Sequence, residues 1–346
     1  MINLAVIGLG IWGQRHVRSA RSSGRFNVTM AVDPDSVRAA PVAEELGLIF
    51  SSTIEDALSN KNIDAVSLAT PHTLHTSQII EAARAGKHIY TEKPFALNIK
   101  DARRSVAAVE EANVVLALGH DQRQYPVVNK LKEMIAEETF GKILHIETNL
   151  SHDSMKLLYL KDRENTDVST QRVWRLDEKE APTGPISQFG IHRVDTFINL
   201  LGTIDWVFAA GSYQALDPSF LDTVSVTVGF SSGIIGYIGN SLATPLYSRL
   251  HILGTEKWAE STGPETFAEY RECSLTNLTI HSNGKRENHS FDIIDSVEKN
   301  FASFADAIEG IAPFAISTNQ MVHNIAVVDA IRESLKTGNR VSVTSD

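Results

Sequence analysis

Short apolar runs alternate with amphipathic stretches over residues 1–119. A short, almost wholly apolar run is typical of a strand covered on both faces, and amphipathic stretches between such runs are typical of helices on a parallel sheet. Two helix starts are indicated, by Thr53 with Asp56 and by Asn98 ahead of Asp101. The pattern predicts an α/β fold with a doubly wound parallel sheet, whose candidate strands are residues 4–7, 28–32, 65–69, 88–90 and 114–118.

The pattern changes after residue 121 and predicts a second domain. Runs separated by Gly and Ser over residues 206–281 are typical of antiparallel hairpins, and the polar stretch 151–172 is either a solvated surface excursion or an ordered substrate lid. We therefore expect residues 1–122 to bind a nucleotide and residues 123–346 to bind substrate. The other expected elements are helices at 125–137, 186–201 and 297–335 and strands at 143–149, 224–230 and 234–238.

Length, charge and cysteine content restrict the class of protein. At roughly 150 residues per domain, 346 residues agree with two domains. The 32 basic and 42 acidic residues give a net charge of −10 without a basic stripe, so a nucleic-acid partner is not expected. No apolar stretch reaches the ~18 residues of a membrane span. Cys273 is the only cysteine, so no intrachain disulfide is possible and a cytoplasmic location is expected.

A glycine-rich motif directly follows the first candidate strand and precedes a helix. Gly8 would allow a tight turn, Gly10 a close approach of a pyrophosphate, and Gly13 close packing of the helix. Such clusters also serve ordinary turns, but Asp33 ends the second candidate strand 20 residues after the last glycine, where an acidic side chain reaches an adenosine ribose. The motif, which predicts dinucleotide binding, reads Gly8-Leu9-Gly10-Ile11-Trp12-Gly13.

Asp33 also bears on the choice of dinucleotide. A carboxylate accepts hydrogen bonds from ribose hydroxyls but repels a 2′-phosphate, and no Arg or Lys directly follows Asp33. The sequence therefore favours NAD over NADP.

A second motif lies at the end of the strand at residues 88–90. Glu92, Lys93 and Pro94 follow that strand, and ligands of open α/β sheets bind beyond the carboxyl ends of strands. This places Lys93 where a nicotinamide and a substrate would meet. The alternative is a surface lysine paired with Glu92 in a loop.

A third constellation lies on the helix expected at residues 186–201. At 100° per residue Gln188, His192, Asp195 and Asn199 form one polar stripe, opposite an apolar stripe. Such a stripe is either the solvated side of a helix, with His192 a bystander, or the face that carries chemistry.

Two histidines raise the question of a metal. His72 and His75 are three residues apart and could share a helix face, but no Asp, Glu or Cys lies at ligand spacing nearby, and Thr70-Pro71 is a natural helix start. No metal is expected.

Taken together, these motifs resemble the glucose-fructose oxidoreductase, inositol dehydrogenase and rhizopine-catabolism (Gfo/Idh/MocA) family over most of the chain. The resemblance rests on the glycine motif with Gln14-Arg15-His16, Thr70-Pro71-His72-Thr73-Leu74-His75, Ala85-Gly86-Lys87-His88 running into Glu92-Lys93-Pro94, Gly119 through Arg123 to Pro126, Trp174-Arg175, and Gly190-Ile191-His192-Arg193-Val194-Asp195.

The resemblance implies a Rossmann domain followed by an α/β domain with a large open, mostly antiparallel sheet that commonly mediates dimers or tetramers. It also implies a pyridine nucleotide and sugar or polyol substrates. Lys93 and His192 match the family's catalytic residues, whereas Arg123, Trp174 and Arg175 are candidate substrate contacts that a salt bridge or a core Trp would explain equally well. The remaining implied cofactor contacts are Thr70, Pro71, His72, His75 and Glu92.

Gln188 departs from the family pattern, which often has Asp four residues before the histidine. A carboxamide cannot accept a hydroxyl proton at neutral pH, so His192 is the better candidate base and Gln188 a substrate contact. Three functions stay open: an NAD-dependent dehydrogenase or reductase of sugars or polyols, an NAD-dependent glycoside hydrolase, and a non-catalytic cofactor-binding regulator.

Overall fold

The computed structural model describes residues 1–153, 156, 177–216, 220–264 and 273–344. The chain folds into two compact units. The first unit comprises Met1–Asp121 and Asp295–Val322, and the second comprises Gln122–Ile294 and His323–Asp346. A segment near the end of the chain therefore belongs with the N-terminal unit.

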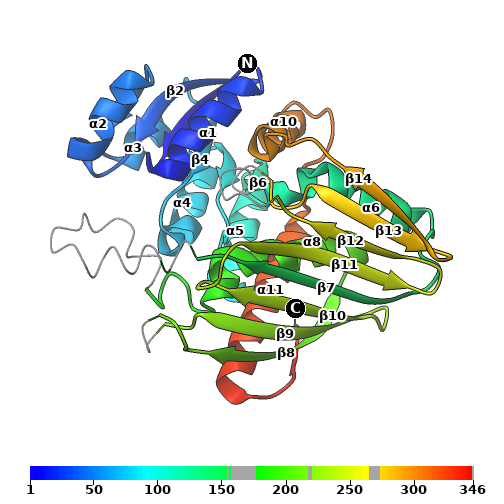
Figure 1. Cartoon of the computed structure of the whole chain (residues 1–346). Helices are drawn as coiled ribbons and strands as arrows, with labels where there is room; N and C mark the ends of the chain where they lie inside the picture. Colours follow the sequence, from blue (N-terminus) through cyan, green and yellow to red (C-terminus); the bar gives the residue numbers. More distant parts are fainter. Residues whose placement is uncertain (154–155, 157–176, 217–219, 265–272, 345–346) are drawn as a thin grey trace. The chain divides into compact units, whose positions relative to one another are not determined.

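The first unit contains a six-stranded parallel sheet in the order β3-β2-β1-β4-β5-β6, of which Figure 1 labels β2, β4 and β6. All five expected strands are confirmed, and the last of them is shorter than expected. The sequence missed β3, which is only three residues long and begins with the exposed Ile49. The strands are β1 Ile2–Ile7, β2 Phe26–Val32, β3 Ile49–Ser51, β4 Ala65–Leu68, β5 His88–Thr91 and β6 Leu116–Leu118.

Helices connect these strands, and their starts test the expected caps. The side chain of Asn98 accepts the Asp101 N–H at 2.9 Å, as expected. The helix start expected at Thr53 is confirmed, since Thr53 is the N-cap residue of α3. The expected capping hydrogen bond is wrong, because the Thr53 side chain forms none and Asp56 instead accepts a hydrogen bond from Ser51. The helices are α1 Ile11–Ser22, α2 Ser36–Glu45, α3 Ile54–Ser59, α4 His72–Arg84 and α5 Ile99–Glu111.

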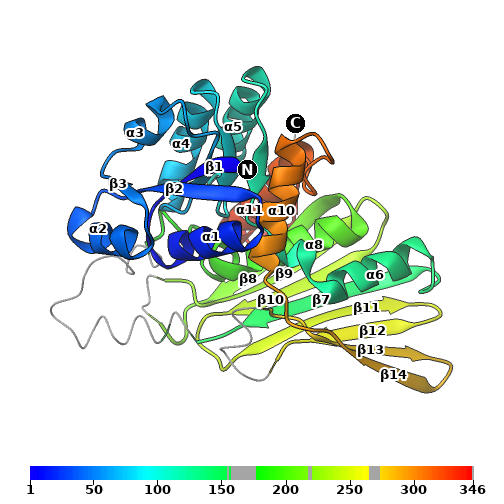
Figure 2. The same ribbon diagram turned by 90° about the horizontal axis from the view of Figure 1, so that it is seen from above.

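Helix α10 (Ser296–Ile308) completes the core of the first unit and lies beside α1 (Figure 2). The ring of Phe301 stacks on Tyr90 of β5 at a centroid distance of 4.2 Å, and Phe304 stacks on Phe26 of β2 at 5.7 Å. Both phenylalanines are fully buried. The tail expected to be one helical region thus begins with a helix that covers the parallel sheet.

The second unit contains a nine-stranded sheet in the order β14-β13-β12-β11-β7-β10-β9-β8-β15 (Figure 1). It is antiparallel except where β10 pairs with β7, so the expected mostly antiparallel sheet is confirmed. The strands are β7 Ile143–Ser151, β8 Ile204–Ser212, β9 Thr223–Phe230, β10 Ile235–Ser241, β11 Tyr247–Gly254, β12 Trp258–Thr262, β13 Asn277–Ser282, β14 Lys285–Ser290 and β15 Val341–Ser342.

Helices α6 (Pro126–Ala136) and α8 (Ile191–Leu201) lie on one face of this sheet (Figure 2). Helix α11 (Thr318–Thr337) begins in the first unit and continues into the second. The opposite face exposes apolar side chains, namely Phe208, Ile235, Tyr237 and Tyr247. In the part of the chain that the structure describes, no helix combines the length and apolarity that a membrane span needs.

Candidate functional site

The glycine motif forms a tight turn between β1 and α1. Gly8 has a φ of +89°, and a Cβ there would lie 2.6 Å from the carbonyl oxygen of Ala69. A Cβ on Gly13 would lie 1.8 Å from the carbonyl oxygen of Gly8. Neither position admits a side chain, so both glycines are required by the turn itself.

Gly10 differs from the other two glycines, because a Cβ there would meet no atom within 4 Å. The open space lies at the N-terminus of α1, where Ile11 and Trp12 begin the helix and helix N–H groups favour anionic ligands. It also lies where β1 and β4 adjoin, at the point where the strand order reverses and where open α/β sheets bind ligands. The residues present fit the pyrophosphate of a dinucleotide.

Asp33 is buried at the end of β2 and is held by three donors. Its Oδ2 accepts the Leu9 N–H at 2.8 Å and Nη2 of Arg38 at 2.7 Å, and its Oδ1 accepts the Asp35 N–H at 3.0 Å. A carboxylate has about four acceptor positions, so room remains for a ribose hydroxyl. The sequence missed Arg38, because this residue is five positions beyond Asp33 and only helix α2 brings it back to the carboxylate.

Glu92 lies just beyond β5, and its partly buried side chain takes part in a series of hydrogen bonds. Nε2 of His16 lies 3.0 Å from Oε1 of Glu92, and Nδ1 of His16 lies 2.8 Å from Oγ of Ser67. Burial alone would raise the pKa of Glu92, but the His16 hydrogen bond and the nearby charges of His16, Lys93 and His75 leave that pKa below its ordinary value. Since His16 and Ser67 are fully buried, these hydrogen bonds order the turn, and Ser67 is not accessible as a nucleophile.

Lys93 directly follows Glu92 and is itself buried. The backbone N–H of Lys93 donates to Oε2 of Glu92 at 3.3 Å, so the ionised carboxylate of Glu92 lies beside the backbone of Lys93. The neighbouring turn after β4 carries Thr70, Pro71 and His72, and the Thr70 hydroxyl donates to Oε1 of Gln78 at 2.6 Å. Because β4 and β5 are adjacent parallel strands, their carboxyl ends place Thr70 and Lys93 on the same edge of the sheet.

Asp121 ends the first unit just after β6 and accepts a hydrogen bond from the hydroxyl of Ser296. Burial, with the negative charge of Glu92 adding to it, raises the pKa of Asp121 to about 6. No local pattern in the sequence indicates this group, because its environment includes a residue 175 positions away.

In the second unit, the helix expected over residues 186–201 is present but begins with a π-helical turn, η3 (Ile186–Gly190), before α8. The expected stripe from Gln188 to His192 therefore begins in a π turn, which contains more residues than an α turn, rather than in a regular α-helix. Gln188 and Asp195 are fully buried, whereas His192 is partly exposed. The interpretation of this face as merely the solvated side of a helix is also wrong.

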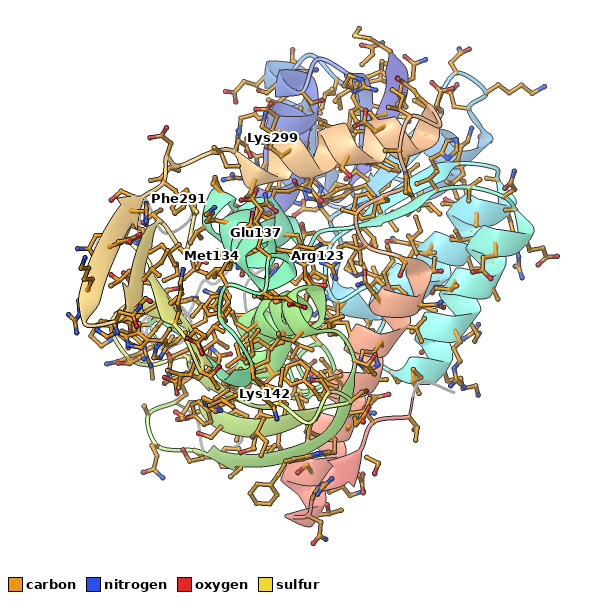
Figure 3. The ribbon with its side chains drawn as sticks, turned by 90° about the vertical axis from the view of Figure 1, so that its right-hand side faces the viewer. Arg123, Met134, Glu137, Lys142, Phe291 and Lys299 are labelled. Carbon is orange, nitrogen blue, oxygen red and sulfur yellow. The ribbon has the colours of Figure 1, made fainter. Side chains whose placement is uncertain are left out.

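Arg123, labelled in Figure 3, belongs to the short helix η1 (Asp121–Gln124) and forms a buried ion pair with Asp195. Its Nε and Nη2 donate to Oδ2 and Oδ1 of Asp195, both at 2.8 Å. The geometry is bidentate, which fixes the orientation of both side chains. The ion pair fixes α8 at Asp195, three residues after His192. It gives Arg123 a structural role, and a contact between Arg123 and substrate stays a prediction.

The remaining expected site residues divide between the units. Lys93 and the other expected cofactor contacts belong to the first unit, and His192 and Gln188 belong to the second. Trp174 and Arg175 lie outside the described residues, as does most of the polar stretch 151–172. Among the described residues, no group of three or more His, Cys, Asp or Glu is arranged to hold a metal ion.

A six-stranded parallel sheet with a glycine turn at its switch point and an acidic residue ending β2 defines a dinucleotide-binding class of protein. Comparison with family models gives the particular family. Residues 2–120 match the oxidoreductase family with an NAD-binding Rossmann fold, GFO_IDH_MocA, and residues 128–260 match the GFO/IDH/MocA C-terminal domain. The chain belongs to this family of NAD(P)-dependent oxidoreductases, as its motifs indicated.

Known proteins resemble the chain to different extents. It is 27% identical to 1,5-anhydro-D-fructose reductase of Ensifer adhaerens over 94% of both chains. It is 29% identical to 2,7-anhydro-N-acetylneuraminate hydratase of Escherichia coli over 67% of this chain and 60% of that protein. Another curated relative is matched over only 40% of its length. The structure of levoglucosan dehydrogenase with NADH and levoglucosan has a TM-score of 0.83 at 22% identity, covering 99% of each chain, and shares the fold.

Proposed function

We propose that this protein is an NAD-dependent dehydrogenase or reductase that acts on a hydroxyl-bearing carbon of a sugar, a cyclic polyol or a sugar derivative. In this proposal residues 1–122 bind the dinucleotide and residues 123–346 bind the substrate, in the cytoplasm. The placement of Lys93 carries the proposal. It follows β5 at the sheet edge that also carries the glycine turn, and the ionised Glu92 lies beside its backbone.

The chain's own residues supply the polar chemistry that oxidation of an alcohol requires. NAD, when bound, supplies the hydride acceptor. The ammonium of Lys93 stabilises negative charge on the substrate oxygen, a role worth roughly 2.7–4 kcal/mol per donor at preorganised sites. A ring nitrogen of His192 accepts the hydroxyl proton, for which imidazole is suited near neutral pH. The carboxamide of Gln188 donates a hydrogen bond to substrate and takes no proton.

The choice of NAD follows from the charge at Asp33. Its carboxylate is buried, accepts the Leu9 N–H of the glycine turn, and would repel a 2′-phosphate. Arg38 lies 2.7 Å from that carboxylate and offsets part of the repulsion. We therefore expect NAD to be preferred, with measurable use of NADP.

A panel of sugars, polyols and anhydrosugars incubated with NAD tests the proposal through net NADH formation. Wild-type protein should reduce NAD with at least one member, and Lys93→Ala should lose turnover while it still binds NAD. Lys87→Ala is the matched control, because Lys87 is also buried in the first unit but donates to the carbonyls of Asn60 and Ile63. Turnover by Lys93→Ala equal to that of wild type contradicts the role.

A relative named as a hydratase favours one second candidate, a reaction in which NAD is reduced and reoxidised within one turnover. A glycoside hydrolase of this kind would cleave its substrate without net NADH. The same panel separates the two classes when product formation is measured beside NADH. Product formation without NADH favours the second candidate. If neither product nor NADH forms, a cofactor-binding regulator is favoured.

The exposed face of the nine-stranded sheet is proposed to bind a second copy of the chain. Its exposed apolar side chains, Phe208, Ile235, Tyr237 and Tyr247, are of the kind that an interface buries. Light scattering should give a dimer or tetramer for wild type and a smaller species for Tyr247→Arg. Ile49→Arg is the control, since it changes another exposed apolar residue, which lies in the first unit. A monomeric wild type contradicts the proposal.

A further inference from the structure

His75 is fully buried near the start of α4 and lies between two backbone carbonyls. Its Nδ1 lies 2.7 Å from the carbonyl oxygen of Pro94, and its Nε2 lies 3.0 Å from that of Thr70. The first carbonyl belongs to the turn that carries Lys93, and the second belongs to the turn after β4. A single ring therefore connects the two turns that we propose to lie at the cofactor site.

The two partners determine which protons the ring carries. A backbone carbonyl oxygen only accepts hydrogen bonds, and a neutral imidazole has one N–H donor and one acceptor nitrogen. A neutral His75 could satisfy only one carbonyl and would direct a nitrogen lone pair at the other. Only the imidazolium, with an N–H on both nitrogens, satisfies the observed geometry.

We infer that His75 is held as a buried imidazolium whose two N–H groups tie the turn after β4 to the Glu92-Lys93-Pro94 turn, so that it acts as a positioning residue for Lys93. The charge state rests on geometry alone. The positioning role rests in addition on the proposed function, because it assumes that Lys93 meets the substrate.

A buried cation needs compensation, and the surroundings of His75 provide it. The compensating group is Glu92, whose pKa is kept below its ordinary value in part by the positive charge of His75. Other titratable groups near this turn are His16 on α1, His72 on α4, with its ring centroid 5.8 Å from that of His75, the Lys93 ammonium, and Asp121 after β6. The ionised Glu92 thus offsets part of the positive charge that we assign to His75, and Asp121 interacts with Lys93 in addition.

This assignment changes the role expected for His75. Both ring nitrogens are used by backbone carbonyls, so the ring acts on the cofactor site through the turns it connects. Loss of both N–H donors would release the Pro94 carbonyl and allow the Lys93 turn to shift, and a shift of about 1 Å in a reacting group can reduce turnover roughly 100-fold. A group that instead contacted the dinucleotide would mainly change its affinity.

The charge state can be measured without any turnover, by 15N NMR of the histidine side chains in the full chain without ligand. The spectrum is recorded at about pH 8, well above the ordinary histidine pKa of about 6.5. His75→Phe assigns the signal. His88 is the internal control, because its Nδ1 accepts the Val115 N–H at 3.0 Å and burial lowers its pKa, so it must be neutral.

We expect both ring nitrogens of His75 to carry protons while His88 shows one unprotonated nitrogen. A neutral His75 overturns the inference, whatever the protein's activity. If the charge state holds, His75→Phe should lower kcat roughly 100-fold while the affinity for NADH, measured by fluorescence, stays close to that of wild type. His88→Gln should leave both unchanged. An unchanged kcat in a folded His75→Phe overturns the positioning role, and failure of the wild type to oxidise any substrate affects the proposed function alone.

Discussion

Replacement of Asp195 by Ala should destabilise the second unit by far more than a surface substitution would. The side chain of Arg123 is only 5% exposed, and its guanidinium would lose its bidentate carboxylate, with both hydrogen bonds of 2.8 Å removed at once. Breaking a buried pair from one side costs about 3–5 kcal/mol, because the other charge stays desolvated. At about 2–4 °C per kcal/mol for a domain of this size class, the melting temperature should fall by roughly 6–20 °C.

The double variant Arg123→Met/Asp195→Leu distinguishes a buried charge from lost packing. Removing both charges and filling the space with apolar side chains is often neutral or stabilising, so the double variant should recover most of the loss. Melting followed by calorimetry and by circular dichroism measures all three proteins. Glu133→Ala is the matched control, because Glu133 pairs with Lys130 at 3.3 Å on the surface of α6 and such pairs contribute about 0–1 kcal/mol.

Two results would refute this reasoning. If Asp195→Ala melts within the range of Glu133→Ala, then the ion pair does not hold α8. If the double variant is no more stable than the single one, then lost packing rather than an uncompensated charge explains the effect. His192 lies three residues before Asp195 on α8, so the single variant should also lower kcat in a folded preparation.

The remaining predictions concern the cofactor, the base and the core. Asp33→Ala should weaken NAD binding more than NADP binding, because it removes a hydroxyl acceptor and a charge that repels phosphate, and an unchanged ratio of dissociation constants contradicts the assignment. Gln188→Asp should shift the pH–rate profile if this buried side chain contacts the reacting hydroxyl, and an unshifted profile places it elsewhere. The pKa of Asp121 rises from 3.8 to about 6 in the folded state, so its contribution to stability is complete below about pH 4 and is lost as the pH rises to 6. Asp121→Asn should therefore gain up to roughly 3 kcal/mol relative to wild type on going from about pH 4 to pH 8 in urea unfolding, and no such gain refutes it. Phe301→Ala should cost about 3–5 kcal/mol, because its fully buried ring stacks on Tyr90, and a loss near that of a surface substitution would show that α10 contributes little to the core.

The parts of the fold that follow from local pattern were predictable. Doubly covered strands have apolar runs, and the start of α5 has its own capping residue, so both are visible in the sequence. The place of α10 was not predictable from its pattern. Its buried Val297, Phe301, Phe304 and Ala305 form an apolar stripe that indicates a helix but does not say which sheet the stripe covers. That choice depends on a partner some 210 positions away, such as Tyr90.

The candidate site shows the same division. The glycine turn and Asp33 were predictable because their spacing is local and each position has a steric or electrostatic requirement. The pairing of Arg123 with Asp195 spans 72 positions and that of His16 with Glu92 spans 76, and no periodicity connects residues so far apart. The π turn at η3 was likewise not predictable, because the apolar positions of the segment fit an α-helix equally well.

A recurring motif does not by itself separate the residues that hold a ligand from those that hold the site. In the structure His75 bridges two carbonyls, Glu92 accepts hydrogen bonds from His16 and from the Lys93 backbone, and Arg123 is committed to Asp195. His75 and Arg123 are buried and Glu92 is partly buried, and the hydrogen bonds of each within its own unit fix the geometry of the neighbouring backbone. The residues whose side chains they position, Lys93 in one unit and His192 in the other, are then the ones from which chemistry is expected.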